Sequence, residues 1–172
     1  SEMCIRDRDK ENNGPFVIRY PRGKGEMADW RNEMHVLPVG KGKKLRDGDD
    51  IAILSLGPIG NEVIKAIKEI EGDGISIAHY DMIYLKPMDE ELLHEVGKKF
   101  SRIITVENGV IRGGLGSAVL EFMADNGYTP KIKRIGVPDE FVEHGPISEL
   151  YKLCGMDAKC IAEEIKKMVI EG

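Results

Sequence analysis

The chain has 172 residues, of which 41% are hydrophobic and 32% are charged, a composition typical of a globular protein with one ordinary domain and a short extension. A net charge of −5 and a pI near 5.5 argue against a surface that binds nucleic acid or an anionic membrane. No apolar run approaches the length that spans a bilayer, and three cysteines without a signal peptide predict a reducing, cytoplasmic location.

The first eight residues share no pattern with the rest of the chain. Residues 1–8 show no periodicity, and we interpret them as a non-native leader, the translated remnant of a sequencing adapter, with a polar leader as the alternative. Gly14-Pro15 predicts a turn, and the β-rich run Phe16–Tyr20 follows it. Residues 9–24 are therefore interpreted as the end of one domain.

A connector and a second domain follow. Residues 25–50 are glycine-rich and charged, which predicts a linker with a short strand near Val36–Val39. From residue 51 onward the pattern changes to regular alternation. The continuous apolar run Ile51–Leu56 is typical of a strand buried on both faces. We expect residues 51–172 to form one complete domain.

Strands and helices alternate through this second domain. Further strands are expected at Ile75–His79, Arg102–Val106 and Lys131–Ile135, and the last of these alternates polar and apolar residues as strands near an edge do. Between and after the strands, apolar residues recur at helical spacing in five segments: Val63 to Ile70, Leu92 to Phe100, Val119 to Met123, Ile147 to Cys154, and Ile161 to Val169. Asp89 and Asp157 are placed to cap the second and the last of these helices. The fold predicted is a three-layer α/β/α sandwich with a mostly parallel sheet.

The turn Gly113–Ser117, between a strand and a helix, has two interpretations. Its backbone N–H groups and the helix dipole could hold a phosphate. However, it is not G-x-G-x-x-G and no P-loop lysine follows Gly116, so we favour a structural role in which the glycines let the helix start close against the sheet or a neighbouring subunit. Ser117 is no nucleophile elbow, because Leu115 and Val119 stand where glycines are required.

Other reactive side chains also have structural alternatives. Cys154 and Cys160 lack a histidine pair at metal-ligand spacing, and Cys154 lies on an apolar helix face, which favours core packing over metal binding. His144 could carry protons, or it could make a loop hydrogen bond or contact another subunit. Glu107 ends a strand, so it either faces a pocket or anchors a loop by accepting backbone N–H bonds.

Two arginines are better candidates for ligand contact. Arg19 and Arg22 flank Tyr20-Pro21 at a strand end, and their planar guanidinium groups suit phosphate or carboxylate. A solvated surface pair is the alternative, and the residues alone leave both open.

Four segments stand out when taken together: Arg19–Gly23, Leu85–Asp89, Thr105–Asn108 with Gly113–Ser117, and Gly136–Gly145. They resemble the 1-deoxy-D-xylulose-5-phosphate synthases, thiamine diphosphate enzymes of the transketolase superfamily. The resemblance covers the chain from about Gly14 to its end, and its discriminating part is the Pro-Asp-x-Phe-Val-Glu-His-Gly core of the last segment. One departure is Ile83-Tyr84, where the family commonly has arginine and then an aromatic residue.

The resemblance implies a C-terminal fragment of a larger enzyme. The parent would condense pyruvate with glyceraldehyde 3-phosphate, with release of CO2, for isoprenoid and thiamine precursor synthesis, and would be a homodimer. Residues 51–172 would be its transketolase C-terminal domain, and residues 9–24 the remnant of its pyrimidine-binding domain. The resemblance assigns the sugar phosphate to Arg22, with Arg19 and Tyr20 as neighbours. Thiamine diphosphate and Mg2+ would bind to domains absent here, so the fragment itself is expected to be inactive.

Two other functions remain as alternatives. The β-subunit of a two-component 2-oxo-acid dehydrogenase shares the domain but not the Val-Glu-His-Gly loop. A stand-alone flavodoxin-like binding module would use Gly113–Ser117 to hold an anion.

Overall fold

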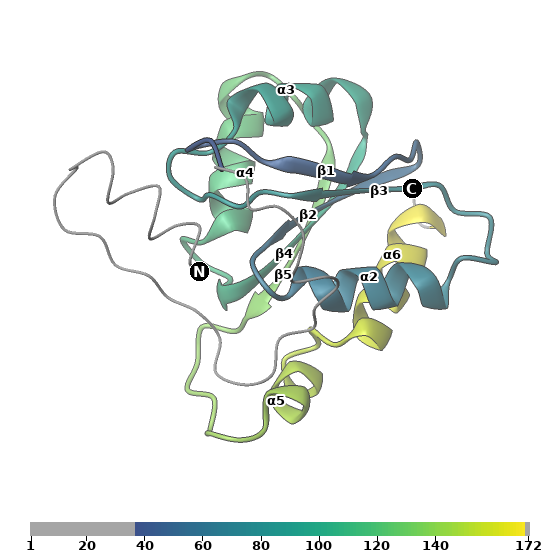
Figure 1. Ribbon diagram of the computed structural model, residues 1–172, viewed down its shortest axis with the longest axis vertical. Coiled ribbons are helices and arrows are strands. Elements are labelled where there is room, and N and C mark those ends of the chain that lie inside the picture. The colour runs from purple at the N-terminus through teal and green to yellow at the C-terminus, as the bar shows by residue number, and fades with distance from the viewer. Residues whose placement is uncertain (1–36, 171–172) are drawn as a thin grey trace, which may run out of the picture. The chain divides into compact units, whose positions relative to one another are not determined.

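The computed structural model of the protein describes residues 37–170 (Figure 1). Their sheet is built on β2 (Ile51–Leu56), a run of apolar residues of which the first five are buried. Its neighbours are β3 (Ile77–Asp81) and β4 (Arg102–Val110), both parallel to it. A strand with apolar side chains on both faces is stable only between two layers, and helices supply both layers here.

Two edge strands complete a five-stranded sheet in the order β1-β3-β2-β4-β5. β5 (Lys131–Val137) pairs parallel to β4, which confirms the edge position expected from its alternating sequence. β1 (Lys43–Arg46) pairs antiparallel to β3 at the opposite edge. The fold class is therefore confirmed as α/β with a mostly parallel sheet.

The helices divide between the two faces of the sheet (Figure 1). On one face lie α2 (Gly60–Glu69) and α6 (Ala158–Ile170), over a core that includes Ile51, Ile53 and Ile104. On the other lie α3 (Glu90–Lys99) and α4 (Leu115–Asp125), over a core that includes Leu54 and Ile103. α5 (Ile147–Leu153) is a short helix with no fully buried residue.

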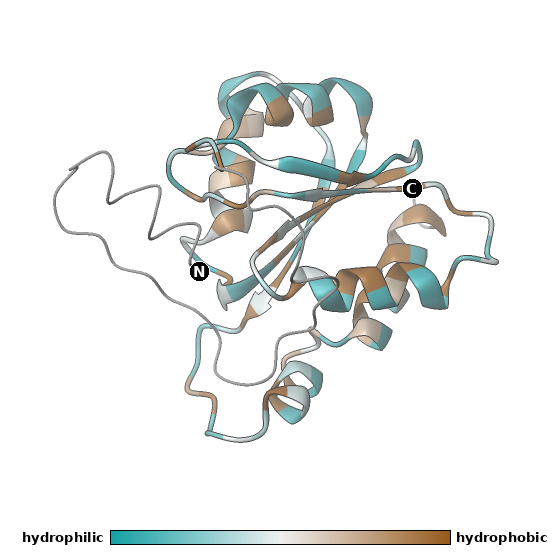
Figure 2. Cartoon of the chain, in the orientation of Figure 1, coloured by the Kyte–Doolittle hydropathy of each residue, from teal (hydrophilic) through white to brown (hydrophobic). Residues whose placement is uncertain are grey.

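The sequence pattern explains the helices well. Figure 2 shows brown hydrophobic and teal hydrophilic residues side by side along α2, as an amphipathic helix requires. Asp89 caps α3 as expected, because its Oδ1 accepts the Leu92 N–H at 3.1 Å. Asp157 Oδ1 accepts the Cys160 N–H at 3.3 Å and so caps the start of α6. No helix within residues 37–170 has the length and apolar character needed to cross a membrane.

β1 lies inside residues 25–50, for which the sequence predicts a linker. All four residues of the strand are exposed, so no apolar periodicity marks it. Its backbone pairing with β3 and the ion pair between Lys44 Nζ and Glu95 of α3, at 2.8 Å, hold it in place. No strand is present at residues 37–39, the described part of the segment near which a short strand was expected.

Candidate functional site

The carboxyl ends of the four parallel strands meet at one edge of the sheet, where α/β proteins usually bind ligands. β4 runs beyond the expected Val106 to Val110, with a register shift between these two residues. Glu107 lies at this shift and is 4% exposed. The edge therefore carries a buried carboxylate directly beside the glycine-rich turn.

Glu107 anchors the turn. Its Oε2 accepts the Leu115 N–H at 2.8 Å and its Oε1 accepts the Gly116 N–H at 2.9 Å. These are first-turn N–H groups of α4, which have no partner within the helix, and the helix dipole favours a negative charge there. The sequence left two roles open for Glu107, facing a pocket or anchoring a loop, and the structure shows that it anchors the loop.

The glycines of the turn allow this close approach. A Cβ at Gly114 would lie 2.0 Å from Glu107 Oε2, and a Cβ at Gly116 would lie 2.7 Å from Thr105 Oγ1 on β4. Only glycine lets the helix begin this close to the sheet. The structural interpretation of Gly113–Ser117 is confirmed, because the protein's own carboxylate occupies the N–H groups that a phosphate would need.

Ser117 fastens the same loop a second time. Its Oγ accepts the Gly113 N–H at 2.9 Å and lies 3.2 Å from Arg134 Nη1. Arg134 Nη1 also donates to the Ile111 carbonyl at 3.0 Å. Because its guanidinium already bonds to a carbonyl and a hydroxyl of this loop, Arg134 holds the loop in position.

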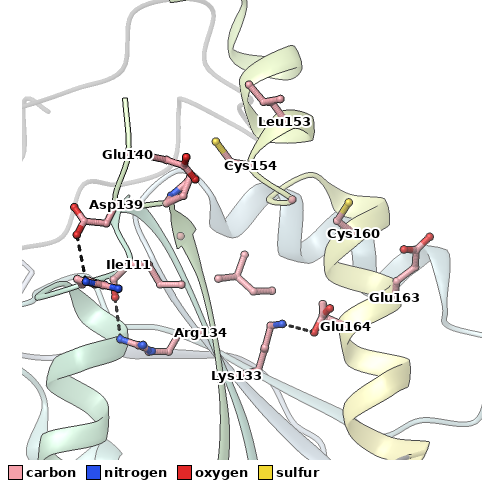
Figure 3. Close-up of a pocket in the computed structure, with 15 residues that line it drawn as sticks. Ile111, Lys133, Arg134, Asp139, Glu140, Leu153, Cys154, Cys160, Glu163 and Glu164 are labelled. Atoms are coloured by element: carbon pink, nitrogen blue, oxygen red, sulfur yellow. Dashed lines mark hydrogen bonds and ion pairs between the residues drawn. The ribbon is translucent and has the colours of Figure 1, made fainter. Parts of the chain in front are cut away.

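A hollow of about 730 Å³ opens beside this loop, between β5 and the α5–α6 region (Figure 3). Several of its charged groups are paired within the protein: Lys133 with Glu164 at 2.8 Å, and Arg112 with Asp139 at 3.7 Å. Glu140 and Glu163 add further carboxylates to the lining. This balance of charge gives the hollow little attraction for a phosphorylated ligand.

Cys154 and Cys160 also line the hollow (Figure 3). Cys154 packs against the core of the α2–α6 face, which confirms the packing role. Hydrogen bonding to Asp157, assisted by burial, raises the pKa of the Cys160 thiol to about 11. A thiol that stays protonated at neutral pH is a poor nucleophile and a poor metal ligand. Within residues 37–170 no group of three metal-binding side chains comes together.

The structure also brings together a buried polar pair that the sequence did not indicate. Ser55 Oγ on β2 and His79 Nε2 on β3 lie 2.8 Å apart, and both residues are at most 1% exposed. Burial lowers the pKa of His79 to about 4, so the ring is neutral at pH 7. The only sequence signal is a polar residue within a mostly apolar run on each of the two strands.

Ile83, the departure from the family pattern, has an unusual backbone. Its φ of 56° lies in the left-handed region, which β-branched residues rarely adopt. Asp81 supports this conformation, because its Oδ1 accepts the Ile83 N–H at 3.1 Å. Burial raises the pKa of Asp81.

His144 is exposed, in the segment between β5 and α5. The candidates for ligand contact, Arg19, Tyr20 and Arg22, lie outside the described residues. The described residues also do not fit thiamine diphosphate or Mg2+, because the α4 N-terminus is filled by Glu107 and no cluster of metal ligands forms among them.

The fold and the glycine-rich turn at the start of α4 define a class of α/β domain. Residues 40–161 match the family model described as transketolase, C-terminal domain, and the chain belongs to this family.

The relatives identify a branch of the family. The chain is 79% identical, over 155 residues, to the 1-deoxy-D-xylulose-5-phosphate synthase of Parabacteroides distasonis, a match that covers 90% of this chain and 24% of that protein. It is 59% identical over 157 residues to the synthase of Bacteroides fragilis, covering 91% and 24%. The chain thus spans about a quarter of the length of these curated relatives.

A solved structure shares the fold. The chain matches a structure titled as a split gene transketolase, inactive beta4 tetramer, with a TM-score of 0.70 and 32% identity, over 78% of this chain and 43% of that one. These likenesses confirm the resemblance on which the sequence interpretation depended.

Proposed function

We propose that this chain is the C-terminal portion of a 1-deoxy-D-xylulose-5-phosphate synthase. The parent enzyme condenses pyruvate with glyceraldehyde 3-phosphate, releases CO2, and supplies precursors of isoprenoids and thiamine. It is a cytoplasmic homodimer that uses thiamine diphosphate and Mg2+. The observation that carries the proposal is the 79% identity to the Parabacteroides distasonis synthase over 90% of the chain.

The described domain serves this enzyme as architecture. The strand-end groups that usually bind ligands in such a fold are engaged internally, by Glu107 at the α4 N-terminus and by Arg134 at the Ile111 carbonyl. The cofactor and the metal bind elsewhere in the parent, and the 172-residue chain alone is inactive. Arg22, with Arg19 and Tyr20 beside it, contacts the phosphate of the aldehyde substrate.

The two alternative functions have less support. A stand-alone module would need free N–H groups at the α4 N-terminus, and Glu107 occupies two of them. A 2-oxo-acid dehydrogenase β-subunit is disfavoured by the names of eight relatives that are 40 to 79% identical to this chain, each of them a 1-deoxy-D-xylulose-5-phosphate synthase.

A chimaera tests the proposal. The matched region of the Parabacteroides distasonis synthase is replaced by the corresponding residues of this chain, and formation of 1-deoxy-D-xylulose 5-phosphate is measured. We expect the chimaera to retain activity within about tenfold of the parent and the 172-residue chain to have none. A folded, cofactor-bound chimaera without activity would contradict the proposal.

A further inference from the structure

The edge strand β1 adds no buried side chain to the domain. All four of its residues are exposed, and Leu45, the one apolar residue among them, is 42% exposed. By contrast, five of the six residues of β2 and four of the five residues of β3 are buried. Because apolar burial is the main driving force of folding, β1 lacks most of the stabilisation that holds the neighbouring strands.

Ion pairs hold β1 in its place. Three basic side chains of residues 41–46 reach acidic groups at the end of α2 and at the start and middle of α3. The pairs are Lys41 with Asp89 (3.6 Å) and with Glu91, Lys44 with Glu95 (2.8 Å), and Arg46 with Glu71 (3.6 Å). The three basic side chains are 40 to 46% exposed, so salt in the solvent screens these pairs.

One carboxylate fastens both the start of this segment and the start of α3. Asp89 Oδ2 accepts the Gly42 N–H at 2.9 Å, while Asp89 Oδ1 accepts the Leu92 N–H at 3.1 Å. Because the two bonds use different oxygens, α3 can keep its cap when Gly42 moves away. The Gly42 N–H therefore reports on residues 41–46, and the Leu92 N–H reports on α3.

The chain is fixed firmly just after β1. Gly48 lies so close to β3 that a Cβ there would be 2.1 Å from the carbonyl carbon of Ile77. Asp50 is bonded twice to Ser76, because its N–H donates to the Ser76 carbonyl at 2.8 Å and its Oδ2 accepts the Ser76 N–H at 2.7 Å. A firmly held turn thus adjoins a strand that only backbone pairing and exposed polar contacts retain.

We propose that residues 41–46 are a detachable strap, which releases from β3 as a unit, pivoting at Gly48, while the rest of the domain stays folded. A strap explains why residues 25–50 have the sequence of a linker although the structure pairs four of them as β1. Once released, residues 41–47 can extend by up to about 25 Å from the pivot, at about 3.3–3.6 Å per residue. The strap is a property of this domain and does not depend on the proposed function.

Hydrogen exchange of the 172-residue chain in low concentrations of urea, resolved by residue with NMR, tests the strap. The Gly42 N–H and the β1 amides bonded to β3 should exchange at least about a hundredfold faster than the slowest amides of β2 and β4. Their rates should hardly change with urea, because a local opening exposes little surface. Equal rates and equal urea dependence in β1 and β4 would overturn the proposal, since β1 would then open only when the whole domain unfolds.

Salt tests whether ion pairs fasten the strap. When KCl is raised from about 0.02 M to about 1 M, exchange at the strap amides should become about tenfold faster, and they should change together. Exchange in β2 and β4 should change less than about twofold, because their side chains are buried and apolar. Strap amides that do not respond to salt, or that respond no more than those of β4, would overturn the proposal.

Two variants separate these ion pairs from other effects of salt. The double variant Glu91→Gln/Glu95→Gln removes two acidic partners of the strap, and strap exchange at low salt should become about three- to fivefold faster. The Leu92 N–H should keep its protection, which shows that α3 stays capped. The matched control Glu121→Gln, on the exposed side of α4, should leave strap exchange unchanged. Equal effects of the double variant and the control would contradict the strap.

Discussion

The buried pair of Ser55 and His79 predicts a loss of stability in weak acid. Burial lowers the pKa of His79 to about 4 in the folded protein, against an ordinary value of 6.5. The unfolded chain therefore binds a proton at this ring between pH 6.5 and 4, and the folded protein does not. The free energy of unfolding must then fall as the pH drops below 6.5, until the folded protein also takes up the proton near pH 4.

The two pKa values set the size of this effect. Proton linkage at the single site costs about 2 kcal/mol at pH 5 and approaches about 3.4 kcal/mol at lower pH, since one pKa unit corresponds to about 1.4 kcal/mol. Urea unfolding of the 172-residue chain at pH 7 and pH 5, followed by circular dichroism, measures it. His79→Gln is the matched variant, because its amide can still reach Ser55 and does not titrate.

The difference between the two proteins isolates His79 from all other titrating groups. The loss between pH 7 and pH 5 should be about 2 kcal/mol smaller in the His79→Gln variant than in the original chain. The same pH dependence in both proteins would refute the argument that the ring is held neutral by burial.

Three further predictions concern the glycine turn and the proposed substrate contact. Glu107→Gln should lower the free energy of unfolding by about 2 kcal/mol, because two charge-assisted hydrogen bonds to α4 are weakened. The control Glu121→Gln, on the exposed side of α4, should change the free energy of unfolding by less than about 0.5 kcal/mol in the same urea assay. Gly114→Ala should lower the free energy of unfolding by about 1–3 kcal/mol, since the new Cβ would lie 2.0 Å from Glu107 Oε2. The control Gly72→Ala should be tolerated, because a Cβ there meets nothing within 4 Å. Equal unfolding midpoints for the two variants would contradict the close-packing argument. In the chimaera, Arg22→Ala should reduce kcat/KM for glyceraldehyde 3-phosphate about tenfold or more, as the loss of a charged hydrogen bond to phosphate implies, and an unchanged kcat/KM would rule out the contact.

The apolar strands and helix faces could be predicted because burial leaves a periodic record in the sequence. Ile51–Leu56 was correct to the residue, and Asp89 caps its helix as expected. β1 left no such record, since all its side chains are exposed and its backbone pairing with β3 holds it. The end of β4 was also missed, because Asn108 and Gly109 disfavour a strand that the pairing of Val110 with Val137 nevertheless extends.

The site depends on contacts between residues that are separated in the sequence and meet only in the folded structure. Glu107 could be placed at a strand end, but only the structure shows both its oxygens on the N–H groups of α4. The Ser55–His79 pair depends on how β2 and β3 lie side by side, which no local pattern encodes. Phe141 belongs to the motif that identifies the family, yet the sequence could not indicate that its side chain would be fully exposed.

The central claim is that this domain supplies architecture and that the cofactor chemistry lies outside it. Calorimetric titration of the 172-residue chain with thiamine diphosphate and Mg2+ tests the claim most directly. We predict no saturable binding, because Glu107 occupies the first N–H groups of α4, and the first N–H groups of α2 bond to the carbonyls of Gly57, Pro58 and Ile59. Saturable binding with a micromolar Kd would contradict the account.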